Sequence, residues 1–135
     1  MTFTPTADDT PYHRLGEAKV RALSEAFYDA MDAHEPALAR LHPLGPDGRV
    51  AEGVRARFAL FLVEWLGGPT GFSRAHGHPR LRMRHAHVPV DTAMRDAWLR
   101  CMTRAMEGCD VPGDVRAYLA VRFAEVADFL RNVAG

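Results

Sequence analysis

The sequence predicts an all-α domain, on three observations. Apolar residues recur at spacings of three and four along most of the chain, which is the spacing of one helix face. No segment shows the strict alternation of a half-buried strand. The length of 135 residues suits one domain with a single core. We therefore expect about five main helices, too unequal in length for a simple up-and-down bundle.

The first predicted helix ends near Pro36, and its apolar stripe consists of Val20, Leu23, Phe27 and Met31. A short helical piece, Ala37 to Leu41, precedes "HPLGPDG", whose prolines and glycines indicate a loop. The next helix is expected to end at "GGP", Gly67 to Pro69. Its stripe consists of Val54, Phe58, Phe61, Leu62 and Trp65.

In the second half of the chain, "TGFSRAHGHP", residues 70–79, is expected to be a loop. Asp91 is a suitable N-cap for a helix whose apolar face consists of Met94, Trp98, Cys101 and Ala105. A break at Gly108 to Gly113 separates it from a last helix. The stripe expected there is Val115, Leu119, Arg122, Val126, Leu130 and Val133.

The composition excludes several classes of protein. Basic and acidic residues number 17 each, and this balance argues against nucleic-acid binding. We expect no signal peptide and no membrane span, because no basic start and no long apolar run occur. Cys101 and Cys109 are too few for a disulfide framework, which favours a cytoplasmic protein. Residues 1–135 are expected to form one domain, with residues 1–11 as a flexible extension.

Four of the seven histidines lie close together: His76, His78, His85 and His87. A zinc site is one hypothesis, but no cysteine joins the cluster and the spacing fits no structural zinc pattern. Solvated loop histidines are the ordinary alternative. His85 and His87 are two residues apart, so on a helix only one of them could face a given core site.

Three polar groups accompany apolar stripes elsewhere in the chain. Tyr28 follows Phe27, His42 stands before a proline at a helix end, and Trp98 lies within a stripe. A buried phenol or indole needs a hydrogen-bond partner. Three such groups converging with one histidine suggest a site for a polar ligand.

The stretch "GHPRLRMRHAHVPVDTAMRDAWLRCM", Gly77 to Met102, resembles the proximal segment of the group II truncated haemoglobins. These are 2-over-2 α-helical globins that bind haem b. The resemblance continues upstream in "KVRALSEAFYDAM" and "FALFLVEWLGGP", and it covers nearly all of the chain from Leu15 onward. It implies a truncated 2-over-2 globin fold that encloses a haem.

The resemblance also implies roles for single residues. His85 would coordinate the haem iron, with its other ring nitrogen donating to a backbone carbonyl. Arg82 and Arg84 would reach the propionates, because an arginine fork suits a carboxylate. The implied distal donors to an iron ligand are Tyr28, His42 and Trp98. The implied contacts with the haem or its pocket are Phe27, Val54, Phe58, Phe61, Leu62 and Met83.

The chain departs from the family pattern in three places. "RLGEAKV" has one glycine, Gly16, where a pair is usual. His87 and Val88 stand where a proline and an aromatic residue are common. His42 stands where tyrosine or phenylalanine is also frequent, which makes the predicted distal network partly ionisable.

The function that the resemblance implies is binding of dioxygen, nitric oxide or carbon monoxide at the haem. A polar pocket favours slow oxygen release, so we expect oxygen and nitric oxide redox chemistry or detoxification rather than bulk oxygen transport. Nitric oxide dioxygenase and peroxidase-like activities are left open, as is a homodimer, and either activity needs an unidentified reductase. Two alternatives are a haem-based gas sensor or redox partner, and a haem-free helical interaction module that binds zinc.

Overall fold

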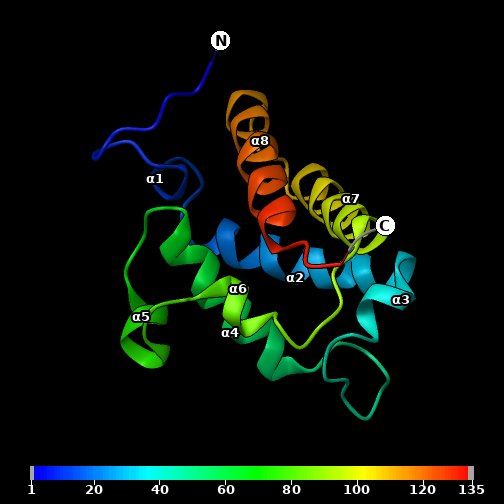
Figure 1. Cartoon of the computed structure of the whole chain (residues 1–135). Coiled ribbons are helices and arrows are strands. Elements are labelled where there is room, and N and C mark those ends of the chain that lie inside the picture. Colours follow the sequence, from blue (N-terminus) through cyan, green and yellow to red (C-terminus); the bar gives the residue numbers. More distant parts are fainter. Residues whose placement is uncertain (1, 134–135) are drawn as a thin grey trace.

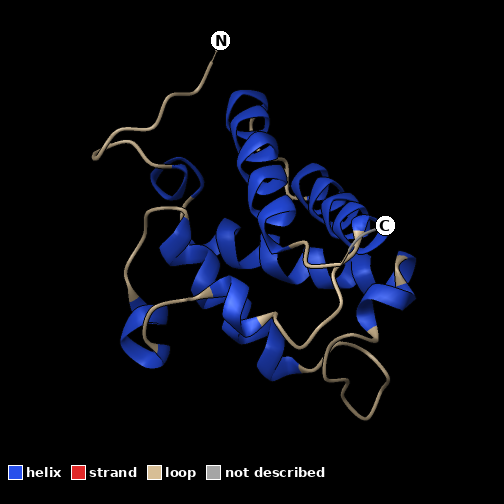
Figure 2. Cartoon of the chain, viewed as in Figure 1, coloured by secondary structure: helices blue, strands red, loops and turns tan. Residues whose placement is uncertain are grey.

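The computed structural model describes residues 2–133, and this part of the chain contains helices and no strand (Figure 1, Figure 2). The all-α prediction is confirmed, although short helices raise the number above the expected five. The eight helices are α1 (Pro11–Leu15), α2 (Glu17–His34), α3 (Pro36–Ala39), α4 (Glu52–Trp65), α5 (Gly71–His76), α6 (Leu81–Arg84), α7 (Thr92–Gly108) and α8 (Gly113–Leu130).

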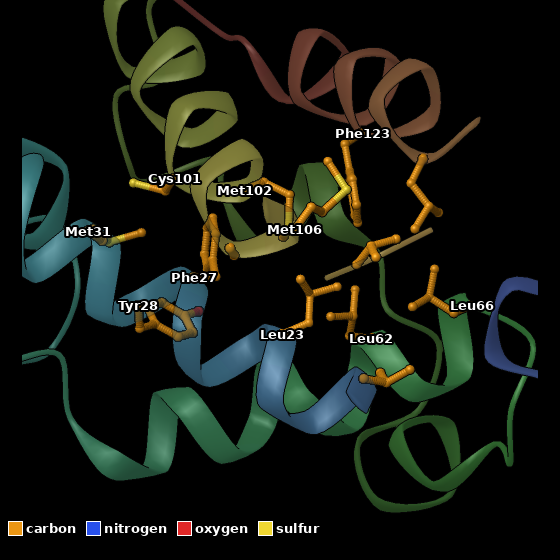
Figure 3. Packing of buried hydrophobic residues seen from close by; sticks show 14 of the residues in the cluster. Leu23, Phe27, Tyr28, Met31, Leu62, Leu66, Cys101, Met102, Met106 and Phe123 are labelled. Carbon is orange, nitrogen blue, oxygen red and sulfur yellow. The ribbon is translucent and has the colours of Figure 1, made fainter. Parts of the chain in front are cut away.

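Helix α2 lies at the centre of the fold, packed against α4 on one side and α7 on the other, and α7 packs against α8 (Figure 1). The predicted stripe of α2 is fully buried; its members are Val20, Leu23, Phe27 and Met31. Figure 3 shows Phe27 directed towards Met102 of α7. The residues between α1 and α2 turn at Gly16, whose φ of 84° lies in the left-handed region that glycine tolerates best. A single glycine therefore suffices at this turn.

Helix α7 begins where the sequence predicted. The carboxylate of Asp91 accepts a hydrogen bond of 2.8 Å from the backbone N–H of Met94, as an N-cap does. The buried face of α7 consists of Ala97, Cys101, Met102, Ala105 and Met106. Burial raises the pKa of the Cys101 thiol to about 12, so it is an inert core group.

The prediction of a loop at residues 70–79 is wrong, because α5 forms there. Glu64 of α4 accepts hydrogen bonds from the backbone N–H of Ser73, at 2.9 Å, and from its hydroxyl, at 2.5 Å. Phe72 is buried, with its ring 5.6 Å from that of Phe61. These contacts with a distant segment support a six-residue helix that its own glycines do not predict.

The register predicted for α8 is also partly wrong. Its buried residues are Val115, Leu119, Phe123 and Ala127. The first two were expected, whereas Arg122, Val126 and Leu130 are only half-buried. Val133 lies beyond the end of the helix and is exposed. The aromatic ring of Phe123, stacked on Trp65 at 5.1 Å, sets the rotation of this helix on the core.

A buried arginine joins α2 to α4. Arg55 is 4% exposed, and it donates to the carbonyl of Val50 over 2.9 Å. Its guanidinium also bonds to Glu25 at 3.1 Å, to Asp29 at 2.9 Å and to Asp32, all on α2. A buried cation is stable only with such partners. Arg55 therefore fixes α4, α2 and the end of the loop that follows α3 relative to one another.

The segment before α1 touches the core at Phe3, which is 4% exposed and packs edge-on against Tyr118 at 5.3 Å. The flexibility of residues 1–11 and the assignment of residues 1–135 to one domain stay predictions. Met1 and residues 134–135 lie outside the described residues. No helix within residues 2–133 is long and apolar enough to cross a membrane.

Candidate haem site

His85 follows α6 directly and is half-buried. Its backbone N–H donates to the carbonyl of Leu81 over 3.1 Å, and its ring Nδ1 lies 2.7 Å from the same oxygen. A carbonyl can only accept, so Nδ1 carries the hydrogen of this bond and Nε2 keeps a lone pair. That is the tautomer in which an imidazole coordinates a metal through Nε2.

His87 differs from His85 in exposure rather than in helix face. The helical argument that separated them is wrong, because α6 ends at Arg84 and both histidines lie in the turn that follows. His87 is exposed, and no described residue forms a hydrogen bond with its ring. His85 is consequently the better ligand candidate of the two.

Tyr28 lies on α2 next to Phe27 and is 4% exposed (Figure 3). Its ring packs edge-on against Phe27 at 5.0 Å and Phe58 at 5.6 Å. No described residue accepts a hydrogen bond from its hydroxyl. Every fully covered side-chain nitrogen or oxygen in the described residues has a partner, so the hydroxyl oxygen keeps accessible surface. Burial raises the pKa of Tyr28, which therefore remains a neutral phenol and a donor.

His42 follows α3, is half-buried, and meets the Tyr28 ring edge-on at 5.8 Å. Its Nδ1 lies 3.0 Å from the carbonyl of Leu38. Burial lowers the pKa of His42, and hydrogen bonding to the backbone of Leu38 and Ala39 only partly opposes this effect. Neutral His42 therefore presents a lone pair at Nε2, and it becomes a donor there only when protonated.

Trp98 lies on α7, half-buried, between Phe27 at 5.0 Å and Phe123 at 5.7 Å. Aromatic packing holds the indole ring. Within residues 2–133 no acceptor receives a hydrogen bond from its indole N–H. Because every fully covered side-chain nitrogen or oxygen in these residues has a partner, the indole nitrogen keeps accessible surface. Tyr28 and Trp98 are thus two donors held by the core and available to a ligand.

The predicted apolar haem contacts have very different environments. Phe58 and Phe61 are half-buried and stack at 6.2 Å, which makes them a suitable wall for a flat ligand. Met83 is 61% exposed. Leu62 is fully covered by core side chains. All four stay predictions as haem contacts, and Leu62 is the least accessible.

The two predicted propionate ligands are not equivalent. The Arg82 guanidinium lies 5.1 Å from the centre of the Phe129 ring and forms no hydrogen bond with a described residue. Arg84 donates to the carbonyls of Pro79, at 2.5 Å, and His76, at 3.0 Å. Arg82 therefore has more donors free for a carboxylate. Both assignments stay predictions.

Two residues beside the site had not been expected there. Arg55 places its guanidinium 5.6 Å from the centre of the Tyr28 ring. Asn132, beyond α8, donates through Nδ2 to the carbonyls of His85 at 3.2 Å and Val88 at 3.0 Å. Neither belongs to a recognisable motif. The one sequence feature that could have indicated a buried Arg55 is the row of carboxylates on α2. No sequence feature indicates the position of Asn132.

The side chains fit a haem and do not fit a zinc site. No three His, Cys, Asp or Glu side chains between residues 2 and 133 gather in a way that could hold a metal ion. A haem needs one axial nitrogen, which His85 offers, and an apolar wall, which Phe58 and Phe61 offer. Tyr28 and Trp98 add unpartnered donors, from which a polar iron ligand would accept hydrogen bonds.

Comparisons with known proteins agree with this geometry. The family model described as "Bacterial-like globin" matches residues 10–132. The group 2 truncated hemoglobin YjbI of Bacillus subtilis is 34% identical over 124 residues, 92% of this chain and 89% of that protein. The group II 2-on-2 hemoglobin of Agrobacterium tumefaciens superposes with a TM-score of 0.83, at 33% identity, over 100% of both chains. A truncated oxygen-avid haemoglobin from Bacillus subtilis gives a TM-score of 0.82, at 32% identity, over 91% of this chain and 99% of its own.

The chain therefore belongs to the bacterial-like globins, and within them to the group II truncated haemoglobins. The predicted 2-over-2 globin fold and the haem cofactor, haem b being the usual form, are confirmed. As a globin the protein binds diatomic gases at its haem, and the haem-free zinc module is wrong.

The exposure of the two histidines and the Nδ1–H bond lead to a test of the proximal ligand. We expect His85→Gly to lose the normal Soret band, because no other half-buried imidazole follows α6, and added imidazole should restore it. His87→Gly is the matched control and should keep the wild-type absorption spectrum. The reverse pattern for the two variants would exclude His85 as the ligand.

Proposed function

We propose that this globin retains dioxygen tightly and uses it in redox chemistry with nitric oxide, rather than releasing it in transport. The observation that carries the proposal is the pair of unpartnered donors, the Tyr28 hydroxyl and the Trp98 indole N–H, held by the aromatic core. A relative of known structure, described as oxygen-avid, also supports tight retention of dioxygen.

The haem supplies the iron at which a diatomic gas binds and exchanges electrons. Tyr28 and Trp98 would donate hydrogen bonds to a diatomic ligand that draws negative charge when the haem binds it. Each such bond is worth about 1.5–3 kcal/mol, so one donor slows release by an order of magnitude or more. Phe58 and Phe61 keep water away from these bonds, and the lower local dielectric strengthens them.

His42 contributes differently from the other two distal residues. Its Nδ1–H is engaged by the carbonyl of Leu38, so the neutral ring offers an acceptor, not a donor, at Nε2. Protonation adds both a donor and a positive charge there. His42 therefore makes the retention of dioxygen depend on pH, whereas Tyr28 and Trp98 do not titrate in the physiological range.

The reaction proposed is the conversion of one nitric oxide, one dioxygen and one electron into one nitrate. The ferrous haem would supply this electron, and a reductase of unknown identity would have to restore it. We propose the cytoplasm as the location, supported by the free thiols Cys101 and Cys109.

Rapid mixing of the oxygenated protein with nitric oxide tests this reaction. We expect nitrate in a one-to-one ratio to haem, together with oxidation of the haem seen in the visible spectrum, because retained dioxygen is consumed before it dissociates. Mixing with buffer alone is the control. If nitric oxide replaces dioxygen and no nitrate forms, the gas-sensor hypothesis is favoured instead.

The pKa of His42, lowered by burial from its ordinary 6.5, predicts a pH dependence of oxygen release. The ring is neutral at pH 7 and becomes protonated as the pH falls through the lowered pKa. The new Nε2–H then stabilises bound dioxygen, so release should slow in acid. His42→Phe should lose this slowing, whereas exposed His34→Phe should retain it. Superimposable pH profiles of the oxygen dissociation rate for wild type and His42→Phe would remove His42 from the site.

Trp98→Phe keeps most of the aromatic packing against Phe27 and Phe123 and removes the N–H donor. Oxygen release should become about tenfold faster if the lost hydrogen bond is worth ~1.4 kcal/mol. Carbon monoxide carries less charge on its outer atom and should be released at nearly the wild-type rate. Trp65→Phe removes the other of the two tryptophans and should change neither rate. Equal acceleration for both gases would indicate a steric role for Trp98, and no change would indicate packing alone.

A further inference from the structure

Asn132 forms a set of hydrogen bonds between the end of the chain and the turn that carries His85. Its Nδ2 donates to the carbonyls of His85 and Val88, and its Oδ1 accepts from the N–H of Val90 over 2.8 Å. Its own backbone N–H donates to the carbonyl of Val90 over 2.9 Å. The amide orientation is unambiguous, because the nitrogen faces two carbonyls and the oxygen faces an N–H.

The turn needs an anchor from elsewhere in the fold. Helix α6 has four residues, too few to be stable alone, and His85 is tied to it through the carbonyls of Leu81 and Met83. The segment from residue 86 to residue 91 contains Pro89, and none of its residues is buried. Among described residues outside the range 80–91, Asn132 is the one that hydrogen-bonds to His85.

Other contacts fix the end of α8 without touching this turn. Arg95 of α7 pairs with Asp128 at 2.8 Å, and Arg131 donates to Thr92 over 3.1 Å. In Figure 1 the red end of the chain runs beside the yellow-green segment that leads into α7. The position of Asn132 is therefore determined by the α7–α8 pair, which is the part of the core beside the site.

We propose that Asn132 is a positioning residue for His85. It transmits the position of α8 to the backbone carbonyl of His85, and so restricts the orientation in which the imidazole meets the iron. The proposal rests on the assignment of His85 as the iron ligand. Removing a hydrogen-bonding group that orients a metal ligand typically changes metal affinity or activity 10–100-fold.

The experiment compares Asn132→Ala and Asn132→Asp with Arg131→Ala in the haem-loaded protein. The aspartate has the shape of asparagine and still accepts from Val90, but it turns a carboxylate oxygen towards the carbonyls of His85 and Val88. Arg131→Ala removes a neighbouring anchor that does not reach the turn. The readouts are the iron–histidine stretching band of the ferrous protein and the rate of haem transfer to an excess of apomyoglobin.

We expect the stretching band to shift and broaden in both Asn132 variants, and haem loss to become about tenfold faster, with aspartate more severe than alanine. Arg131→Ala should match the wild type in both measurements. Wild-type bands and rates in Asn132→Asp would overturn the proposal, as would equal changes in Arg131→Ala. His85→Gly tests the ligand assignment separately. If this variant keeps the wild-type stretching band, His85 is not the iron ligand, and the proposal about Asn132 is wrong because its premise is wrong.

Discussion

In the His85 side chain, Nδ1 donates to the carbonyl of Leu81 over 2.7 Å, and this bond decides which ring nitrogen keeps its lone pair. Without it both tautomers would be populated, and the ring could turn about its Cβ. The carbonyl belongs to a helix of four residues, so the bond is only as well placed as that helix is. The position of His85 therefore depends on residues outside α6, including Phe129 against Arg82 and Asn132 on the turn.

The same arrangement recurs at His42 with a different consequence. There too, Nδ1 faces the carbonyl four residues earlier, that of Leu38, and Nε2 is left with a lone pair. At His85 a lone pair is what a metal needs, whereas at His42 it prevents donation to a ligand. The resemblance to the family implies that both histidines lie at the haem, but only the hydrogen bonds show that neutral His42 offers an acceptor where Tyr28 offers a donor. The depressed pKa of His42 keeps these roles distinct at neutral pH.

The sequence predicted those features that depend on local pattern. The α2 stripe and the Asp91 cap follow from spacing and cap chemistry, and both are confirmed. Helix α5 and the rotation of α8 were missed, because Glu64 bonding to Ser73 and Phe123 stacking on Trp65 are contacts between distant segments. Likewise, the candidate ligand and donors could be named from a resemblance. Their tautomers could not, since these depend on where α6 and α3 end. The bonds made by Asn132 could not either, since they depend on where α8 ends.

The fold keeps the polar Tyr28 hydroxyl protonated beside an apolar core. Its neighbour Phe27 points into the core, while the polar row of α2 on the adjoining face holds Arg55. Burial raises the pKa of the phenol, and the guanidinium 5.6 Å from its ring centre lowers it, with burial the larger effect. The hydroxyl thus stays protonated, yet the nearby cation draws electron density from the ring and makes the hydroxyl a stronger donor. Arg55 also joins α2 to α4, so the side chain that polarises the Tyr28 ring also ties together the helices that carry Tyr28 and Phe58.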